Sequence, residues 1–373
     1  MDFTIILNSL IVSGIGALLA ASISIVDLFV NNYGEVNIDI NDGKKILNVK
    51  GGSPLLFTLS DQGIFIPSAC GGRGSCAMCK VAVKSDVGPI LPTELPYLNE
   101  DEKNEGIRLS CQVKVKKDIK IKIPDELFNV RKYQCVVESI RDLTHDIKEI
   151  RIALPETENI NFTAGQYIQF EAPPYNKIKD ATQRAYSISS IPKDDKIIEL
   201  IIRLVPGGIV TSYIFDELKE MQKINIVGPF GEFKMQETKA DMICVAGGSG
   251  MAPIKSIIND MKDKGIADRN VWYFFGARSF KDLFYLKEFD RLEKELKNLR
   301  FIPALSEPAA KDSWTGETGI ITDVLDKYLK TKIDKHSEKE GYLCGSPGMI
   351  DACVRVMTSN GIPENKIYYD KFA

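Results

Sequence analysis

The sequence is poor in histidine and carries almost no net charge. Only His145 and His336 occur among 373 residues. Histidine metal centres and catalysis by a Ser-His-Asp or Cys-His set therefore have almost no side chains to use, and we expect both histidines at the surface. The 48 basic and 51 acidic residues leave a formal net charge of −3. The chain thus lacks the basic surface that nucleic-acid binding requires.

A chain of this length is too long for one ordinary domain and long enough for two or three. Its eight cysteines would suit the disulfides of a secreted protein. However, a long chain with several of its thiols clustered in one stretch fits a reducing compartment better. We therefore expect several domains whose soluble part lies in the cytoplasm.

The clustered thiols form the most specific motif. Cys70, Cys76 and Cys79 follow a C-x5-C-x2-C pattern in a glycine-rich stretch, and Cys111 follows later in the chain. Four thiolates on a flexible loop are the ligand set of a [2Fe–2S] cluster. A structural zinc site is the alternative, but zinc ribbons usually use two C-x2-C pairs, and only one is present. The spacing therefore favours an iron–sulfur cluster as the metal centre.

The first 30 residues contain an uncharged apolar run from Phe3 to Val26. This run is long enough to cross a bilayer as one helix. A cleaved signal peptide is the alternative, but no basic region precedes the run, which also exceeds the usual apolar core of such peptides. Lys44, Lys45 and Lys50 follow it, which favours a cytoplasmic location for the rest of the chain. We predict a single-pass transmembrane anchor in residues 1–30.

Residues 34–126 are predicted to form a domain around the cysteine loop. Val36–Ile40 and Lys45–Val49 alternate as strands on either side of an Asn-Asp-Gly turn, which is typical of a β-hairpin. Lys80–Lys84 and Asp118–Pro124 alternate in the same way. This arrangement resembles a β-grasp ferredoxin.

Residues 127–236 are predicted to form a small antiparallel barrel. They contain six short β-rich runs separated by proline, glycine, aspartate and asparagine, as in such barrels. Within them, Arg184 and Tyr186 would share one face of a strand, and Ser187 would lie on the other. Further on, glycines precede a helix-like run at Pro206–Ile214, and a helix start is a ready phosphate site. The six runs are Tyr133–Ile140, Ile147–Leu154, Tyr167–Glu171, Ala185–Ser189, Ile197–Val205 and Lys223–Val227.

The order of these residues resembles the ferredoxin–NADP reductase superfamily, in which an R-x-Y-S strand and a later G-x-x-[ST] helix start hold a flavin. The resemblance implies that Arg184 neutralises the pyrophosphate of FAD and that Tyr186 packs on the flavin. It also implies that Ser187 hydrogen-bonds near the flavin N5 edge. The phosphate cradle would then consist of Gly208, Thr211 and Ser212.

Residues 237–373 are predicted to form an α/β domain with a parallel sheet. An apolar run at Asp241–Ala246 leads through a glycine-rich turn into a helical pattern at Ile254–Met261. Strand, glycine turn and helix form the phosphate-binding arrangement of such sheets, although the turn is not G-x-G-x-x-G. Further strands are predicted at Val271–Gly276, Leu299–Leu305 and Gly341–Cys344, with helices at Leu283–Leu296 and Thr318–Leu329.

Cys344 would lie at the carboxyl edge of this sheet, where such folds bind ligands. Alternatively, it is a buried strand residue, as we expect of Cys244 and Cys353. In the reductase superfamily, G-G-[ST]-G-x-[AT]-P followed by C-G-x-P marks the nicotinamide site, which implies that Cys344 lies beside the hydride-transfer locus. The same resemblance implies that Phe372 covers the isoalloxazine. It assigns nucleotide binding to Gly247, Gly248, Ser249, Gly250 and Pro253.

The domain order, together with three motifs, resembles the F subunits of Na⁺-translocating NADH:quinone oxidoreductases. The motifs are Pro89–Glu94, Gly106–Gln112 and Trp314–Gly319. The resemblance implies an oxidoreductase that passes electrons from NADH through FAD and a [2Fe–2S] cluster to membrane subunits, which reduce quinone and translocate sodium. It also implies location in the inner membrane. FAD suits this route because it exchanges electrons in pairs or singly.

Two alternatives remain. One is a reductase that feeds an oxygenase and uses the same three modules, but such a diffusible protein has no use for an apolar anchor. The other is a membrane-tethered ferredoxin-like electron carrier whose C-terminal half binds no cofactor. The coenzyme is open as well, because Arg278 and Lys281 could bind a 2′-phosphate. We expect them to be solvated and the coenzyme to be NADH.

Overall fold

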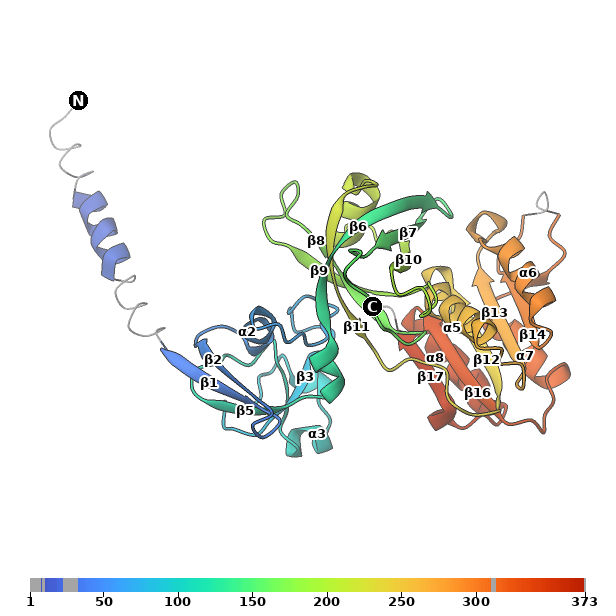
Figure 1. The fold of residues 1–373 in the computed structure, drawn as a ribbon, viewed down its shortest axis with the longest axis horizontal. Coiled ribbons are helices and arrows are strands. Elements are labelled where there is room, and N and C mark those ends of the chain that lie inside the picture. Colours follow the sequence, from blue (N-terminus) through green and yellow to red (C-terminus); the bar gives the residue numbers. More distant parts are fainter. Residues whose placement is uncertain (1–7, 9–10, 23–32, 310–312, 372–373) are drawn as a thin grey trace, which may run out of the picture. The chain divides into compact units, whose positions relative to one another are not determined.

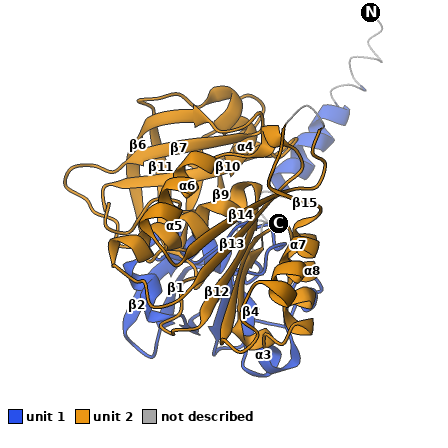
Figure 2. Ribbon diagram, turned by 90° about the vertical axis from the view of Figure 1, so that its right-hand side faces the viewer, with its two compact units in different colours: residues 1–129 blue, residues 130–373 orange. Residues whose placement is uncertain are grey.

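The computed structural model describes residues 8, 11–22, 33–309 and 313–371. The chain divides into two compact units, residues 1–129 and 130–373 (Figure 2). We call them unit 1 and unit 2 and describe each by itself.

The predicted anchor, Phe3–Val26, lies largely outside the described residues. Of this run, residues 11–22 are helical and expose their side chains. Within the described part of the chain, none of the helices combines the length and the apolar character needed to cross a membrane.

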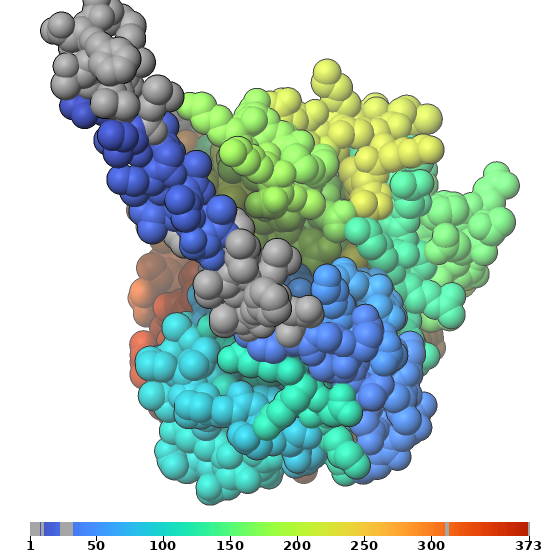
Figure 3. All heavy atoms as spheres, turned by 90° about the vertical axis from the view of Figure 1, so that its left-hand side faces the viewer, coloured from blue at the N-terminus to red at the C-terminus, as the bar shows by residue number. Residues whose placement is uncertain are grey.

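Unit 1 is a β-grasp fold. Its mixed five-stranded sheet has the order β2-β1-β5-β3-β4 (Figure 1). The first and last strands of the unit, β1 and β5, pair in parallel, and Figure 3 shows the corresponding blue and blue-green segments side by side. Helix α2 (Leu55–Asp61) buries three leucines in the core beneath the sheet. The strands are β1 (Glu35–Ile40), β2 (Lys45–Lys50), β3 (Lys80–Val83), β4 (Ile107–Leu109) and β5 (Ile119–Lys122).

The long segment between β3 and β4 contains only short helical turns. These are η1 (Leu95–Tyr97) and α3 (Glu100–Asn104), and η2 (Asp125–Asn129) closes the unit. Helix α3 begins with a capping box, in which Asn99 and Glu102 each bond the backbone N–H of the other. This reciprocal pairing satisfies two amide donors that a helix start otherwise leaves unbonded.

A buried ion pair ties this segment to the sheet. Glu94 is fully buried, and its carboxylate accepts from Arg108 Nη2 at 2.7 Å and Nε at 3.0 Å. The backbone N–H groups of Leu91 and Leu109 also donate to Glu94, while Arg108 donates to the carbonyls of Gly88 and Pro89. Every polar group of the pair therefore has a partner, as a buried charge requires. The pair joins two of the motifs that the sequence singles out.

Unit 2 begins with a six-stranded antiparallel barrel, which we call the barrel lobe. The strand order is β10-β7-β6-β11-β8-β9, and a bridge between Ile188 and Leu200 joins the two ends of this order. All six predicted strands are present, within a few residues of the expected bounds. They are β6 (Arg131–Asp142), β7 (Ile147–Ala153), β8 (Tyr167–Ala172), β9 (Thr182–Ser187), β10 (Ile197–Arg203) and β11 (Lys223–Phe230).

The rest of unit 2, the sheet lobe, contains a parallel sheet of order β15-β14-β13-β12-β16-β17. Helices α5 and α6 contribute to the hydrophobic core on one face, and α7 and α8 to the core on the other (Figures 1 and 2). The strands are β12 (Asp241–Gly247), β13 (Val271–Ala277), β14 (Leu299–Leu305), β15 (Glu317–Thr318), β16 (Lys339–Gly345) and β17 (Ile367–Lys371). The helices are α5 (Met251–Asp263), α6 (Leu286–Glu295), α7 (Ile321–Thr331) and α8 (Pro347–Ser359).

The sheet lobe differs from expectation in several places. The short strand β15 was not predicted, and the helix expected from Thr318 begins only at Ile321. The helix predicted from Leu283 begins only at Leu286, because Tyr285 takes a left-handed conformation with φ of 58° and a 3₁₀ turn, η5 (Phe280–Asp282), precedes it. The sequence analysis also missed β17 at the sheet edge. It ends in Asp370 and Lys371 and buries only Ile367, so it lacks the continuous apolar run by which buried parallel strands are recognised.

Replacing Glu94 by glutamine should destabilise unit 1 by about 3 kcal/mol, because it leaves Arg108 buried without a counter-charge. Burial alone would raise the pKa of Glu94, but hydrogen bonds from Arg108, Leu91 and Leu109 hold it below its ordinary value. The stabilisation is therefore complete above the ordinary glutamate pKa and is lost as the pH falls through the lower pKa of the folded protein. Hydrogen exchange at the amides of β3 and β4, measured against pH, would show both effects.

Asp86→Asn is the matched control. It removes an ion pair with Lys117 in the same unit, but both of these side chains are exposed, so the free energy of unfolding should hardly change. Equal protection of β3 and β4 in the Glu94→Gln variant and in the native protein would contradict the prediction.

Candidate functional site

The four predicted metal ligands of unit 1 lie together as two pairs. The thiol of Cys79 donates to Cys111 Sγ at 3.4 Å, and the side chains of Cys70 and Cys76 are hydrogen-bonded to each other. All four are free thiols, three of them buried. Among the described residues, no group of three or more histidine, cysteine, aspartate or glutamate side chains is arranged to hold a single metal ion. Two pairs of thiols match the needs of two irons with two terminal ligands each.

The loop stabilises negative charge on one sulfur of each pair. The pKa of Cys70 is lowered to about 3 by its hydrogen bond from Cys76 and by backbone N–H groups of Ser75 and Arg73. The pKa of Cys111 is lowered to about 7, first by Cys79 and then by Gln112. Cluster ligands must be thiolates, and amide donors around the sulfurs set the potential of a bound cluster.

Two further features fit a cluster at this loop. Gly74 has φ of 75°, and a Cβ there would lie 2.8 Å from Gln112 Nε2, so only glycine permits this close turn. Ser110, between β4 and Cys111, is fully buried, and its hydroxyl interacts with the sulfur of Cys79. A buried hydroxyl beside two ligand cysteines can donate a hydrogen bond to a thiolate ligand of a cluster.

In the barrel lobe, strand β9 carries the residues predicted to hold the flavin. Arg184 and Tyr186 are half-buried on one face, and Ser187 is buried on the other. The Tyr186 ring packs edge-on against Phe170 at 6.5 Å, and burial raises its pKa, so it stays a neutral phenol. Arg184 Nη1 donates to the carbonyl of Gln183 at 2.7 Å.

The predicted phosphate cradle is a tight loop before a short helix, α4 (Ile209–Ser212), which continues as a π-helical turn, η3 (Tyr213–Glu217). Thr211 is buried, and its hydroxyl accepts from the N–H of Val205 at 3.2 Å and lies 3.4 Å from the carbonyl of Gly208. Thr211 therefore shapes the loop from inside, and its direct contact with phosphate stays a prediction. The amide N–H of Ser212 donates to Gly208 at 2.9 Å.

In the sheet lobe, the glycine-rich turn connects β12 to α5. Gly247 ends the strand, and η4 (Gly248–Gly250) contains the next three predicted residues, including Ser249. Pro253 is buried in the first turn of α5. A Cβ on Gly250 would lie 2.3 Å from the carbonyl oxygen of Cys344. The turn and the end of β16 therefore touch backbone to backbone.

Cys344, at the end of β16, is fully buried, and burial raises the pKa of its thiol well above the ordinary value. It is a neutral thiol in the sheet and does not line the cleft described below. Its neighbour in the register is Asp370 of β17, whose carboxylate accepts from Ser187 Oγ at 3.1 Å. Asp370 thus contacts Ser187, which is predicted to bind the flavin, and lies beside Cys344, which is predicted to lie near the nicotinamide. Phe372 lies outside the described residues.

Sequence reasoning missed Asp370. Its pKa is raised by burial, although the hydrogen bond from Ser187 acts in the opposite direction. A single acidic residue near the end of a polar tail has no periodicity that marks it. The one available signal was the strand predicted at Gly341–Cys344. A further parallel strand beside it would have brought the C-terminal residues, and with them Asp370, to the edge of the sheet.

A cleft of about 690 Å³ opens at the carboxyl edge of the sheet lobe. Gly247 and Gly248 line it together with Ser346, and residues of the barrel lobe, such as Arg203, complete it. This volume is that of a ligand site. Arg278 and Lys281 also line it, and Arg278 pairs with Glu307 at 3.3 Å, with both side chains exposed.

Three family profiles match the chain. Residues 38–116 match the 2Fe-2S iron-sulfur cluster binding domain, residues 134–235 the oxidoreductase FAD-binding domain and residues 244–355 the oxidoreductase NAD-binding domain. The predicted ferredoxin, barrel and parallel-sheet folds and the three predicted cofactors are thereby confirmed, and the match favours an iron–sulfur cluster over zinc.

Among solved structures, the chain is similar to an Amycolatopsis cytochrome P450 reductase, GcoB. The two are 26% identical with a TM-score of 0.71, over 90% of this chain and 98% of the other. The ferredoxin reductase in carbazole 1,9a-dioxygenase is also 26% identical, with a TM-score of 0.68, over 91% of this chain and 99% of that one.

Other relatives are more similar in sequence and are named as F subunits of Na⁺-translocating NADH-quinone reductases. The protein from Neisseria gonorrhoeae is 39% identical, over 91% of this chain and 92% of its own length. The one from Klebsiella pneumoniae is 38% identical, over 99% and 97%. This similarity over nearly the whole length, with the same three domains, shows that the chain belongs to the family of F subunits of Na⁺-translocating NADH-quinone reductases.

Proposed function

We propose that this chain is the electron-entry module of an NADH:quinone oxidoreductase, which oxidises NADH and releases single electrons through its [2Fe–2S] centre. The observation that carries the proposal is the convergence at Asp370. Its carboxylate contacts Ser187 of the flavin strand and pairs in register with Cys344 beside the glycine turn. Two cofactor-binding lobes whose predicted reactive edges meet at one residue are arranged for transfer between their ligands.

The bound cofactors would supply the redox chemistry, since a flavin can exchange electrons with a nicotinamide in pairs and with a cluster singly. The chain's residues bind and orient them. Arg184 and the loop around Gly208 would hold the FAD phosphates, Tyr186 would pack on the flavin, and Ser187 would bond its N5 edge. The turn Gly247–Gly250 would hold the nucleotide phosphates. No side chain is needed as a general acid or base for the hydride step.

In unit 1, Cys70 and Cys76 would hold one iron, and Cys79 and Cys111 the other. We retain residues 34–126, 127–236 and 237–373 as the three functional domains. The acceptors would be membrane subunits of the same complex, through which electrons reach quinone. In this proposal residues 1–30 cross the inner membrane once, with the redox domains in the cytoplasm.

A reductase for an oxygenase is the alternative function. It is favoured by the likeness to the GcoB and carbazole dioxygenase reductases. The higher identity to the relatives from Neisseria gonorrhoeae and Klebsiella pneumoniae supports the quinone reductase. Purification of the intact chain from membranes, followed by identification of the proteins that accompany it, would separate the two.

The cluster and the flavin should be lost independently. The Cys79→Ala variant should lose the visible absorbance of the cluster, because one iron then lacks a terminal thiolate, yet NADH should still bleach its flavin at the native rate. Anaerobic spectra before and after addition of NADH would measure both. Cys353→Ala, which removes a buried thiol from α8, should retain both signals. Loss of flavin reduction in Cys79→Ala would mean that the two sites are not independent, and absence of flavin reduction in the native protein would refute the proposed function.

NADH should be preferred over NADPH, because the cleft cation Arg278 is already paired with Glu307, whose carboxylate would repel a 2′-phosphate bound there. The Glu307→Gln variant should reduce the ratio of kcat/KM for NADH to that for NADPH by about tenfold, which corresponds to loss of one charge repulsion of about 1.4 kcal/mol. Steady-state ferricyanide reduction with each nucleotide measures this ratio. Glu293→Gln, on α6 and outside the cleft lining, is the control. If the ratio is unchanged in Glu307→Gln, the Arg278–Glu307 pair does not determine the preference for NADH.

Removal of residues 1–32 should release the chain from membranes without affecting NADH oxidation, since the cofactor-binding domains follow that segment. Fractionation of cells that express the full and shortened chains would test this. A shortened chain that still sediments with membranes would show that attachment comes from elsewhere in the protein.

A further inference from the structure

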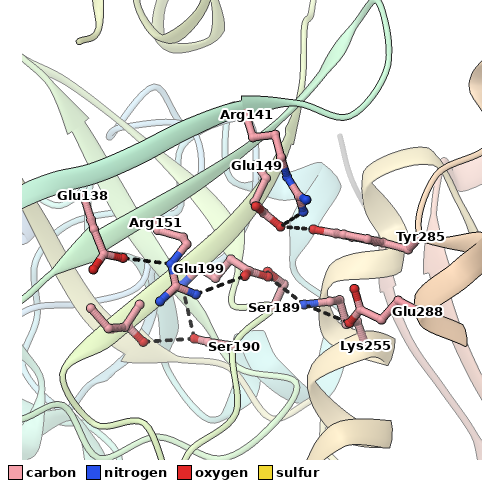
Figure 4. Close-up of polar contacts among 11 residues, drawn as sticks. Glu138, Arg141, Glu149, Arg151, Ser189, Ser190, Glu199, Lys255, Tyr285 and Glu288 are labelled. Carbon is pink, nitrogen blue, oxygen red and sulfur yellow. Dashed lines mark hydrogen bonds and ion pairs between the residues drawn. The ribbon is translucent and has the colours of Figure 1, made fainter. Parts of the chain in front are cut away.

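A buried ion pair joins the two lobes of unit 2 (Figure 4). Lys255 lies on α5 of the sheet lobe, and Glu199 lies on β10 of the barrel lobe. The Lys255 Nζ is 2.8 Å from Glu199 Oε1, and each side chain is only 9% exposed. Charges are buried only when they are paired and hydrogen-bonded, so the two side chains must meet when the lobes come together.

Further polar contacts surround the pair on both sides. Glu199 also accepts from Ser189 Oγ at 2.7 Å and lies 3.6 Å from Arg151. Lys255 also lies 3.6 Å from Glu288 and 5.1 Å from the centre of the Tyr285 ring. Burial alone would raise the pKa of Glu199, but Lys255, Ser189 and Arg151 hold it below the ordinary value. The carboxylate is therefore ionised.

Two more hydrogen bonds cross between the lobes beside the pair. The hydroxyl of Tyr285 donates to Glu149 of β7, and Ser256 Oγ donates to the carbonyl of Ser190 at 2.6 Å. Hydrophobic contact is non-directional, whereas these bonds fix both distance and angle. The polar contacts therefore define one relative placement of the lobes.

The position of these contacts in the chain connects them with the cofactor sites. Ser189 and Ser190 lie two and three residues after the end of β9, the strand of Arg184, Tyr186 and Ser187. Lys255 and Ser256 lie in the first turns of α5, directly after the turn Gly247–Gly250. A few residues of rigid strand and helix thus separate the contacts between the lobes from both sites.

We propose that Lys255 and Glu199 form a positioning pair that fixes the glycine turn against the flavin strand and so sets the approach of the nicotinamide ring to the flavin. The proposal rests on the proposed function. Reacting atoms must lie about 3–3.5 Å apart, and a displacement of about 1 Å can lower a rate about a hundredfold. The two rings belong to different lobes, so their distance depends on contacts between the lobes. Neither residue lines the cleft, so the role is one of positioning.

Two other ion pairs provide matched controls, because each lies within the sheet lobe. Lys262 is on the same helix as Lys255 and pairs with Glu295 of α6. Arg269 and Glu340 form a pair that is even more deeply buried, with 1% exposure of each side chain and a distance of 2.9 Å. The first controls for a lost charge on α5, and the second for lost stability.

The test uses the full chain with its cofactors and the double variant Lys255→Met/Glu199→Gln, since a single change would leave one charge buried without a partner. Stopped-flow measurement gives the limiting rate of flavin reduction at saturating NADH. Equilibrium titration gives the affinity for NAD⁺, and the long-wavelength charge-transfer absorbance reports contact between the two rings. We expect the limiting rate to fall by about tenfold or more and the charge-transfer band to weaken, while FAD content and NAD⁺ affinity stay at native values. The single variant Lys255→Arg, which keeps the positive charge, should retain most of the native limiting rate.

The controls Lys262→Met and Arg269→Met/Glu340→Gln should keep the native limiting rate, even where the second lowers the unfolding temperature. A native limiting rate in the Lys255/Glu199 variant overturns the proposal, as does a loss of FAD or of NAD⁺ affinity that accounts for the slower reaction. If the native protein itself fails to transfer hydride from NADH, the proposed function is refuted and this proposal with it. If the native protein turns over and the double variant equals it, only the positioning role fails.

Discussion

The close approach of Gly250 to the carbonyl of Cys344 is the constraint on which the geometry of unit 2 depends. No side chain fits between the two backbones, so α5 starts directly against the end of β16. This contact places the glycine turn beside the edge of the sheet, next to which β17 brings Asp370 to Ser187 of the barrel. The cleft at this edge follows from the same arrangement, because parallel strands leave their carboxyl ends open where a helix begins.

In unit 1, the loop that carries the cysteines must also be held in a defined position, but it contains little regular secondary structure. The four cysteines of the unit come from this loop and from the end of a short strand, and few backbone hydrogen bonds of the sheet hold that loop. The buried pair of Glu94 and Arg108 compensates, since it fixes the segment before η1 to β4, the strand that leads to Cys111. Thr93 extends the contact by donating to Gln112 at 3.0 Å, the residue that also approaches Gly74. A loop that must wrap a cluster is thus held mainly by side chains.

Much of this organisation could be predicted from the sequence, because it rests on local patterns. Alternation predicts the barrel strands, apolar runs predict β12 to β14, and cysteine spacing predicts the cluster loop. Asp370, Glu199 and Lys255 could not be found in this way. A charged residue in a strand or helix normally indicates a solvated face, and only the contact between lobes shows that Glu199 and Lys255 are buried and that Asp370 is partly buried. The pairing of Glu94 with Arg108 likewise explains two motifs that the sequence shows only as separate strings.

The buried pairs of this chain also differ in what they can accomplish. Apolar side chains of the right shape can often replace a buried ion pair without loss of stability, so the Arg269–Glu340 pair inside the sheet lobe adds little that packing could not supply. Between lobes the situation is different, because two apolar surfaces can slide past each other at small cost. Lys255 donates a hydrogen bond to Glu199 of the other lobe at 2.8 Å and lies 3.6 Å from Glu288 of its own lobe, which favours one relative position of the two lobes. In this protein, a buried ion pair therefore contributes most where the barrel lobe and the sheet lobe must contact each other at a defined distance.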